Sequence, residues 1–169
     1  MKKILFVTSA CLCLSACGFE PIYGTHLQSN AGQESVQSQL AQVEIDGIPD
    51  RSGQFLRNAL IDKFYRKGRP QSLRYTLHVE PIKESTIDLD ITKSSDATRA
   101  QLRLKTAMIL KDEMTGEIVL TRSLRSIASY NVLTSEFATR VSAQNMRENA
   151  LNDLARQIEL QIALYLKRN

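Results

Sequence analysis

The chain of 169 residues has no tryptophan and only two histidines, His26 and His78. These two do not stand at a metal-binding spacing, and the sequence has neither a glycine-rich phosphate loop nor a serine nucleophile elbow. His26 lies in a polar stretch, and His78 is expected on the polar side of a strand, solvated or hydrogen-bonded. Asp88, Asp90 and Asp96 fall in a loop-like region, and two of them lie in a turn rich in serine and threonine, where acidic residues are expected. The sequence therefore predicts no catalytic site, no bound metal and no cofactor.

Cysteine is also scarce, because the only three are Cys11, Cys13 and Cys17. The first two are expected to leave with a signal peptide, so the processed chain keeps a single sulfur. A disulfide and a cysteine metal site are thereby excluded, even in an oxidising compartment.

Charge and long apolar runs are modest. The net charge is +4, and subtracting the two lysines of the signal peptide leaves about +2, which does not indicate a nucleic-acid partner. After residue 17 no apolar run is long enough to span a bilayer. The remaining length suits one domain with one core.

What the sequence does contain is a lipoprotein signal in residues 1–16. Met1-Lys2-Lys3 is a basic start, and Ile4–Leu14 is an apolar run of signal-peptide length that is too short to cross a bilayer. Leu14-Ser15-Ala16-Cys17 matches the bacterial lipobox, in which the thiol takes a diacylglycerol, the signal peptide is cut and the freed amine is acylated. Cys17 is therefore the predicted lipidation site. The alternative is an ordinary secretory signal beside a chance cysteine.

Gly18 follows the predicted lipid anchor. Aspartate at this position resembles an inner-membrane retention signal, so Gly18 favours delivery to the outer membrane, on its periplasmic side. Gly24 to Gln42 is polar and rich in serine and glutamine, and residues 17–41 are predicted to form the lipidated N-terminus and a tether. A weak amphipathic helix near Val36 to Val43 is the alternative. The folded periplasmic domain is expected over residues 42–169.

The domain is expected to begin with a strand and a helix. Gln42 to Ile48 alternates and predicts a short strand, after which Asp50 has the chemistry of a helix N-cap. Arg51 to Lys67 is predicted to be helical, and Gly68 ends it. One face of this helix carries apolar side chains at every fourth position: Leu56, Leu60 and Phe64.

Longer strands follow this helix. Ser72 to Pro81 alternates apolar and polar residues, and a continuation from Ile82 to Asp90 requires a kink, as at an edge or a bulge. Thr92 to Asp96 predicts a turn, and Ala100 to Lys111 alternates again. Asp112 to Gly116 has the chemistry of a hairpin turn.

The return strand from Ile118 to about Tyr130 leads to a helix from Ser135 to Leu166. The predicted buried stripe of this helix consists of Phe137, Val141, Leu151, Leu154, Ile158, Ile162 and Tyr165. The order β-α-β-β-β-α predicts an α+β fold, namely a two-layer sandwich of a mostly antiparallel four-stranded sheet with two helices on one face.

Basic side chains gather on one side of the sheet. Arg99, Arg103 and Lys105 have the same parity, so they are expected to project from one face of one strand, on which successive alternate positions are roughly 6–7 Å apart. Arg122 and Arg125 have opposite parity and are expected on opposite faces of the next strand unless a bulge intervenes. Such a row suits the phosphates of an acidic glycolipid. The alternative is an ordinary solvated sheet face.

Three segments carry a family resemblance. Cys17-Gly18-Phe19-Glu20-Pro21-Ile22-Tyr23-Gly24 opens the processed chain, and Arg51-x-Gly-Gln-x-Leu-Arg57-Asn58-x-Leu60 lies in the first long helix. Tyr130-Asn131 precedes the last helix, which contains many alanines and leucines. Together they resemble the LPS-assembly lipoprotein family, the small lipoprotein subunit of the outer-membrane lipopolysaccharide (LPS) translocon. The resemblance covers essentially the whole chain after the signal peptide.

The resemblance implies a protein that plugs a large outer-membrane β-barrel LPS-assembly protein, helps that barrel to assemble and touches LPS on its way to the surface. Only Cys17 is carried over from the family by its motif. An LPS-binding role for Arg99, Arg103 and Lys105 rests on their chemistry alone. Two other functions remain open: a non-catalytic envelope lipoprotein with a structural or stress role and no LPS binding, and a small hydrolase, against which the missing catalytic residues argue.

Overall fold

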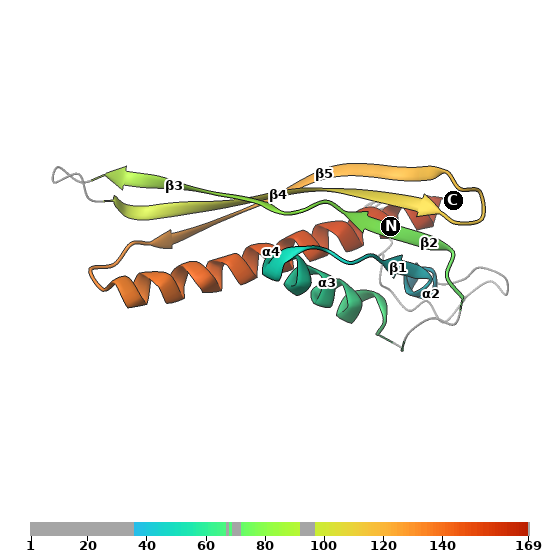
Figure 1. Cartoon of the computed structure of the whole chain (residues 1–169), viewed down its shortest axis with the longest axis horizontal. Helices are drawn as coiled ribbons and strands as arrows, with labels where there is room; N and C mark the ends of the chain where they lie inside the picture. Colours follow the sequence, from blue (N-terminus) through green and yellow to red (C-terminus); the bar gives the residue numbers. More distant parts are fainter. Residues whose placement is uncertain (1–35, 67, 69–71, 92–96, 169) are drawn as a thin grey trace, which may run out of the picture. The chain divides into compact units, whose positions relative to one another are not determined.

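The computed structural model describes residues 36–66, 68, 72–91 and 97–168 (Figure 1). The predicted signal peptide, the lipidation site Cys17, His26, Asp96 and most of the predicted tether lie outside the described residues. The elements, in chain order, are α2 (Val36–Ala41), β1 (Val43–Ile45), α3 (Asp50–Phe64), β2 (Tyr75–Val79), β3 (Lys83–Ile91), β4 (Ala97–Asp112), β5 (Ile118–Asn131) and α4 (Glu136–Arg168).

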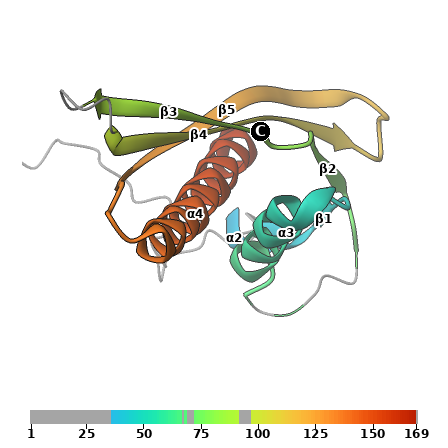
Figure 2. The ribbon, with the colours of Figure 1, turned by 60° about the vertical axis from the view of Figure 1, so that its left-hand side comes forward.

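The elements form two layers, with α3 and α4 on the same side of one sheet (Figure 2). This arrangement confirms the predicted α+β two-layer fold class. The strand β4 is central: it pairs along one edge with β5 and along its other edge with β2 and β3, all antiparallel. The short β1 adds to β2 in the parallel direction.

The sheet has five strands rather than the predicted four, because the second edge of β4 is shared by two strands in line. Val79 of β2 lies opposite Met108, whereas Lys83 of β3 lies opposite Lys105, so the register shifts by one residue between them. Pro81 stands in the break, where it has no N–H to donate to the ladder. The kink expected for a strand that continues beyond Pro81 is therefore where β2 ends and β3 begins.

Alternation along β4 decides which face of the sheet is covered. Even-numbered positions from 100 to 112 point towards the helices and are buried, and odd-numbered positions are exposed or half-buried. Leu102, Leu104, Met108 and Leu110 are at most 2 % exposed. The helices complete this core with fully buried side chains: Leu56, Leu60, Phe64, Leu154, Ile158 and Ile162.

The start of the described chain is a short helix rather than a tether. In α2, Leu40 is fully buried, and the Gln37 side-chain amide donates hydrogen bonds to the carbonyl oxygens of Lys63 (3.3 Å) and Phe64 (3.2 Å). These bonds satisfy acceptors at the end of α3. The alternative expectation of a helix near Val36 therefore agrees with the structure.

The N-cap prediction for Asp50 was wrong. An N-cap residue has extended backbone angles, and these belong to Pro49 (φ −65°, ψ 163°), which makes no side-chain cap hydrogen bond. Asp50 has φ 67° and is already the first residue of α3. Its carboxylate still lies in the first turn, where the helix dipole favours a negative charge.

The predicted stripe of α4 is buried only in its later part. No residue of α4 before Ala150 is buried, and Phe137 and Val141 remain 77 % and 44 % exposed. They lie on the same helical stripe as the core residue Ala155, but α3 is much shorter than α4 and does not reach its first turns (Figure 1). Tyr165 is half-buried and packs edge to face on Tyr75, with ring centroids 6.3 Å apart.

Candidate functional site: a cationic sheet face

The face of the sheet opposite the helices carries the basic residues singled out in the sequence. Arg99, Arg103 and Lys105 occupy odd positions of β4, so all three lie on this open face. Arg103 donates from Nε to Oε1 of Gln101 at 2.7 Å, which holds its guanidinium along the strand. The register with the neighbouring strands shows which other side chains join them.

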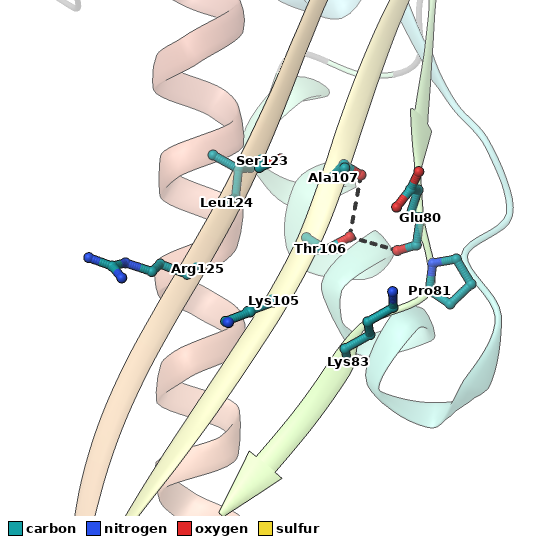
Figure 3. Close-up of a pocket in the computed structure, with 9 residues that line it drawn as sticks. All are labelled: Glu80, Pro81, Lys83, Lys105, Thr106, Ala107, Ser123, Leu124 and Arg125. Atoms are coloured by element: carbon teal, nitrogen blue, oxygen red, sulfur yellow. Dashed lines mark hydrogen bonds between the residues drawn. The ribbon is translucent and has the colours of Figure 1, made fainter.

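Three cations lie directly opposite one another across three strands. Lys105 of β4 faces Lys83 of β3 on one side and Arg125 of β5 on the other. We name these three residues the cationic row (Figure 3). Directly opposite residues have Cβ atoms about 4.5–5.5 Å apart, and like charges in such pairs are destabilising. The fold therefore holds this row at a cost in stability.

In the described part of the chain, the side chains of the cationic row have no acidic partner in an ion pair. Among the residues that the structure describes, none forms an ion pair or a hydrogen bond with the side chain of Lys83, Lys105 or Arg125. The Gln157 amide donates at 3.1 Å to the carbonyl oxygen of Arg125, which is a backbone contact. Several basic residues elsewhere in the domain do have acidic partners. Lys63 and Arg66, for example, both pair with the buried Glu159, at 3.1 and 3.2 Å. The cationic row is thus set apart from the ordinary ion pairs of this domain.

The row borders a shallow hollow of about 460 Å³ at the break between β2 and β3. The Thr106 hydroxyl donates to the Glu80 carbonyl oxygen at 2.7 Å, and the Glu80 N–H donates to the Ala107 carbonyl oxygen at 2.9 Å. These bonds keep the two strands together where Pro81 interrupts the ladder. Glu80 also lines this hollow, so that one acidic residue stands among three basic ones (Figure 3).

A bridge beneath the sheet fixes β3, and with it Lys83. Glu84, the next residue, points to the helix side and accepts hydrogen bonds from Arg147 of α4, at 2.9 Å from Nε and 2.6 Å from the terminal nitrogen. Hydrogen bonding to Glu84 raises the pKa of Arg147, although partial burial opposes this rise. Because neighbouring side chains alternate in a strand, this bridge directs Lys83 to the open face.

The two arginines of β5 follow the parity expected for them. Arg122 lies opposite Met108, on the helix side, whereas Arg125 lies opposite Lys105, on the open face. Sequence reasoning did not include Arg125 among the candidate binding residues, although the buried Leu124 beside it indicates its direction. Lys83 was missed because its face depends on the one-residue register shift at the strand break.

The other candidate residues do not form a site. His78 is exposed on β2, with Nδ1 3.2 Å from Oδ2 of Asp46, in agreement with the expected hydrogen-bonded histidine. The loop-like region expected around Asp88 and Asp90 is instead part of strand β3, where Asp88 is exposed. Within the described ranges, no three histidine, cysteine, aspartate or glutamate side chains gather at metal-binding distances. None of the helices in these ranges combines the length and apolar character of a membrane span.

Comparison with known proteins shows a shared fold. No protein-family model matches the chain. No curated protein matches it either. A candidate lipoprotein from Caulobacter crescentus is similar in structure, with a TM-score of 0.62, 24 % identity, and coverage of 79 % of this chain and 97 % of that one. A minor lipoprotein from Acinetobacter baumannii has a TM-score of 0.55 and 22 % identity, over 72 % of this chain and 91 % of its own.

A more distant sequence has the same architecture. The rare lipoprotein B from Shewanella oneidensis is 9 % identical, with a TM-score of 0.56 over 72 % of this chain and 91 % of its own. At these identities the similarity defines the fold class. The architecture is thus one that occurs in several proteins described as bacterial lipoproteins.

Proposed function

We propose that this chain is a lipid-anchored outer-membrane lipoprotein that helps to assemble and plug a β-barrel LPS translocon and contacts LPS during its transport. The observation that carries the LPS-binding part is the cationic row, three unpaired cations held side by side on an open sheet face. The lipobox at Cys17 and the fold shared with lipoproteins support the location. The resemblance to the LPS-assembly lipoprotein family supplies the barrel partner.

The chemistry of the row suits the phosphates of lipid A and of the core sugars. Lys83, Lys105 and Arg125 present ammonium and guanidinium groups from adjacent strands, and Arg103 lies one alternate position further along β4. A charge-assisted hydrogen bond contributes about 1.5–3 kcal/mol where water is excluded. A bound phosphate also removes the repulsion between the three cations. Salt weakens contacts on such an open face, so binding is expected to fall with ionic strength.

The LPS role is tested with residues 17–169 and purified LPS at low and high salt. The triple variant Lys83→Gln, Lys105→Gln and Arg125→Gln is expected to lose most of the salt-dependent binding. Arg122→Gln is the matched control, because this exposed arginine also lies on β5 but on its other face. Equal binding by the triple variant and wild type would remove LPS from the proposal and favour an envelope lipoprotein of structural or stress role.

The barrel role is tested in the membrane. A tagged chain is purified from detergent-solubilised outer membrane, where a stoichiometric β-barrel protein is the expected companion. Depletion of the chain is expected to lower the amount of folded barrel and to admit large antibiotics. A chain recovered alone, with unchanged barrel level and an intact permeability barrier, would contradict this role.

A further inference from the structure

The first turns of α4 expose an apolar patch that the fold leaves uncovered. Phe137 and Val141 lie one turn apart on the helix and are 77 % and 44 % exposed, and Leu133, in the segment before the helix, is 48 % exposed. Leu133 is held against the helix start, because its N–H donates to Oγ1 of Thr139 at 2.8 Å and its carbonyl accepts from the same hydroxyl. We name these three apolar residues the α4 patch.

Local sequence does not explain why these side chains are exposed. Phe137 and Val141 continue the stripe that is buried further along α4, where α3 covers it. The first turns of α4 extend past the end of α3 (Figure 1), and the bridge between Arg147 and Glu84 lies further along the helix. A large aromatic side chain exposed on a domain surface, with apolar neighbours, is typical of a contact surface.

We infer that the α4 patch contacts the phospholipid bilayer to which the chain is anchored. This inference rests on the lipid anchor of the proposed function. Three properties of the molecule favour the bilayer as the occupant: the size of the patch, the reach of the anchor and the charge around the patch.

The patch by itself is smaller than a stable protein interface. Its three side chains expose about 300 Å² together, when an aromatic side chain is taken as about 200 Å², whereas a stable complex buries about 800 Å² on each partner. A weak apolar contact is nevertheless sufficient to bind a bilayer to which the chain is already tethered. The lipid anchor makes the first contact, and contact through the patch is then intramolecular.

The reach of the chain allows this contact. Nineteen residues lead from Cys17 to Val36, and they can span at most about 65 Å when fully extended. The helix α2 packs against α4, whose 33 residues are about 50 Å long. A lipid on Cys17 therefore permits either end of α4 to meet the bilayer.

The charge around the patch does not oppose insertion. Glu136 and Arg140 flank Phe137 and form an ion pair with each other, so the rim of the patch is close to neutral. The cationic row, by contrast, lies on the sheet face and would attract anionic lipids by charge. Contact through the α4 patch should therefore occur on zwitterionic lipid and persist at high salt, which separates it from attraction to the row.

The chain offers a direct test, because it contains no tryptophan and residues 17–169 contain a single thiol, Cys17. This thiol is coupled to a maleimide lipid in phosphatidylcholine vesicles, and Phe137→Trp supplies the only tryptophan. Its emission is expected to shift to shorter wavelength and to be quenched by brominated phosphatidylcholine at low and high salt. Met114→Trp is the matched control, since Met114 is 81 % exposed in the turn between β4 and β5 and should be neither shifted nor quenched.

Three results would overturn the inference: no quenching of the Phe137→Trp reporter, equal quenching of both reporters, or a shift that grows with protein concentration without vesicles, which would assign the patch to a second copy. Adding Val141→Asp to the reporter is expected to abolish the quenching while circular dichroism stays unchanged, because Val141 is outside the core. The chemical coupling replaces acylation and no LPS is present. A negative result here therefore leaves the proposed function untouched, and failure of LPS binding or of lipidation leaves this test valid.

Discussion

Reversing the central charge of the cationic row should make the domain more stable and less able to bind LPS. Lys105 lies directly opposite both Lys83 and Arg125, so Lys105→Glu turns two repulsive pairs into two attractive ones. At about 5 Å and the dielectric constant of water, one pair of unit charges interacts by about 0.8 kcal/mol, within the range of measured cross-strand pairs. After side-chain motion and screening, a net stabilisation of about 1–2 kcal/mol is expected at low salt.

The measurement is urea unfolding of residues 17–169 at low and high salt, with LPS binding followed in parallel. Arg103→Glu is the control for stability, because Arg103 lies opposite Ser85 and Ile127 and reverses no directly opposed pair. Lys105→Glu should therefore gain more stability than Arg103→Glu, and the difference should shrink as salt is added. A Lys105→Glu variant that is destabilised, or equally stabilised at all salt concentrations, would refute the repulsion on which the argument depends.

Three further changes test other parts of the molecule. Gly53→Ala should destabilise the fold by about 1–3 kcal/mol, since the added Cβ would lie 2.7 Å from Cγ2 of Ile48. Gly47→Ala is the control, because a Cβ at residue 47 meets nothing within 4 Å. Equal denaturation midpoints for the two variants would contradict the close contact at Gly53. Burial alone would raise the pKa of Asp153, but hydrogen bonds from Ser126, Gln157 and Arg156 outweigh it and lower this pKa. The stability that this carboxylate contributes is present above the unfolded pKa of about 3.9 and is lost as pH falls through the lower folded pKa. Asp153→Asn should therefore flatten the acid side of a plot of melting temperature against pH. An unchanged plot would contradict the role of these hydrogen bonds. Cys17→Ser should leave the precursor uncleaved and unacylated. Mass spectrometry of the wild-type N-terminus is the measurement, and an unmodified Cys17 or a different N-terminal residue would reject the lipobox.

Much of the fold was predictable because it is written in local patterns. Alternation over Ala100 to Lys111 indicates the strand β4 and the face of Lys105. The residues from Asp112 to Gly116 indicate the turn that follows, in which Gly116 has a φ of 76°. The change to a helical period after Ser135 marked α4. The lipobox at Cys17 is likewise a contiguous motif. Each of these features depends on residues within a few positions of one another, so a single sequence is sufficient to predict it.

Other features depended on how separate elements meet. The face of Lys83 follows from a one-residue shift between β2 and β3, and only pairing with β4 defines that shift. The exposure of Phe137 follows from where α3 begins and ends, not from the apolar stripe of α4 itself. Periodicity states which side chains share a face, whereas the length and register of the neighbouring elements decide whether that face is covered. The cationic row and the α4 patch are both of this second kind, and therefore only the tertiary structure brought them into view.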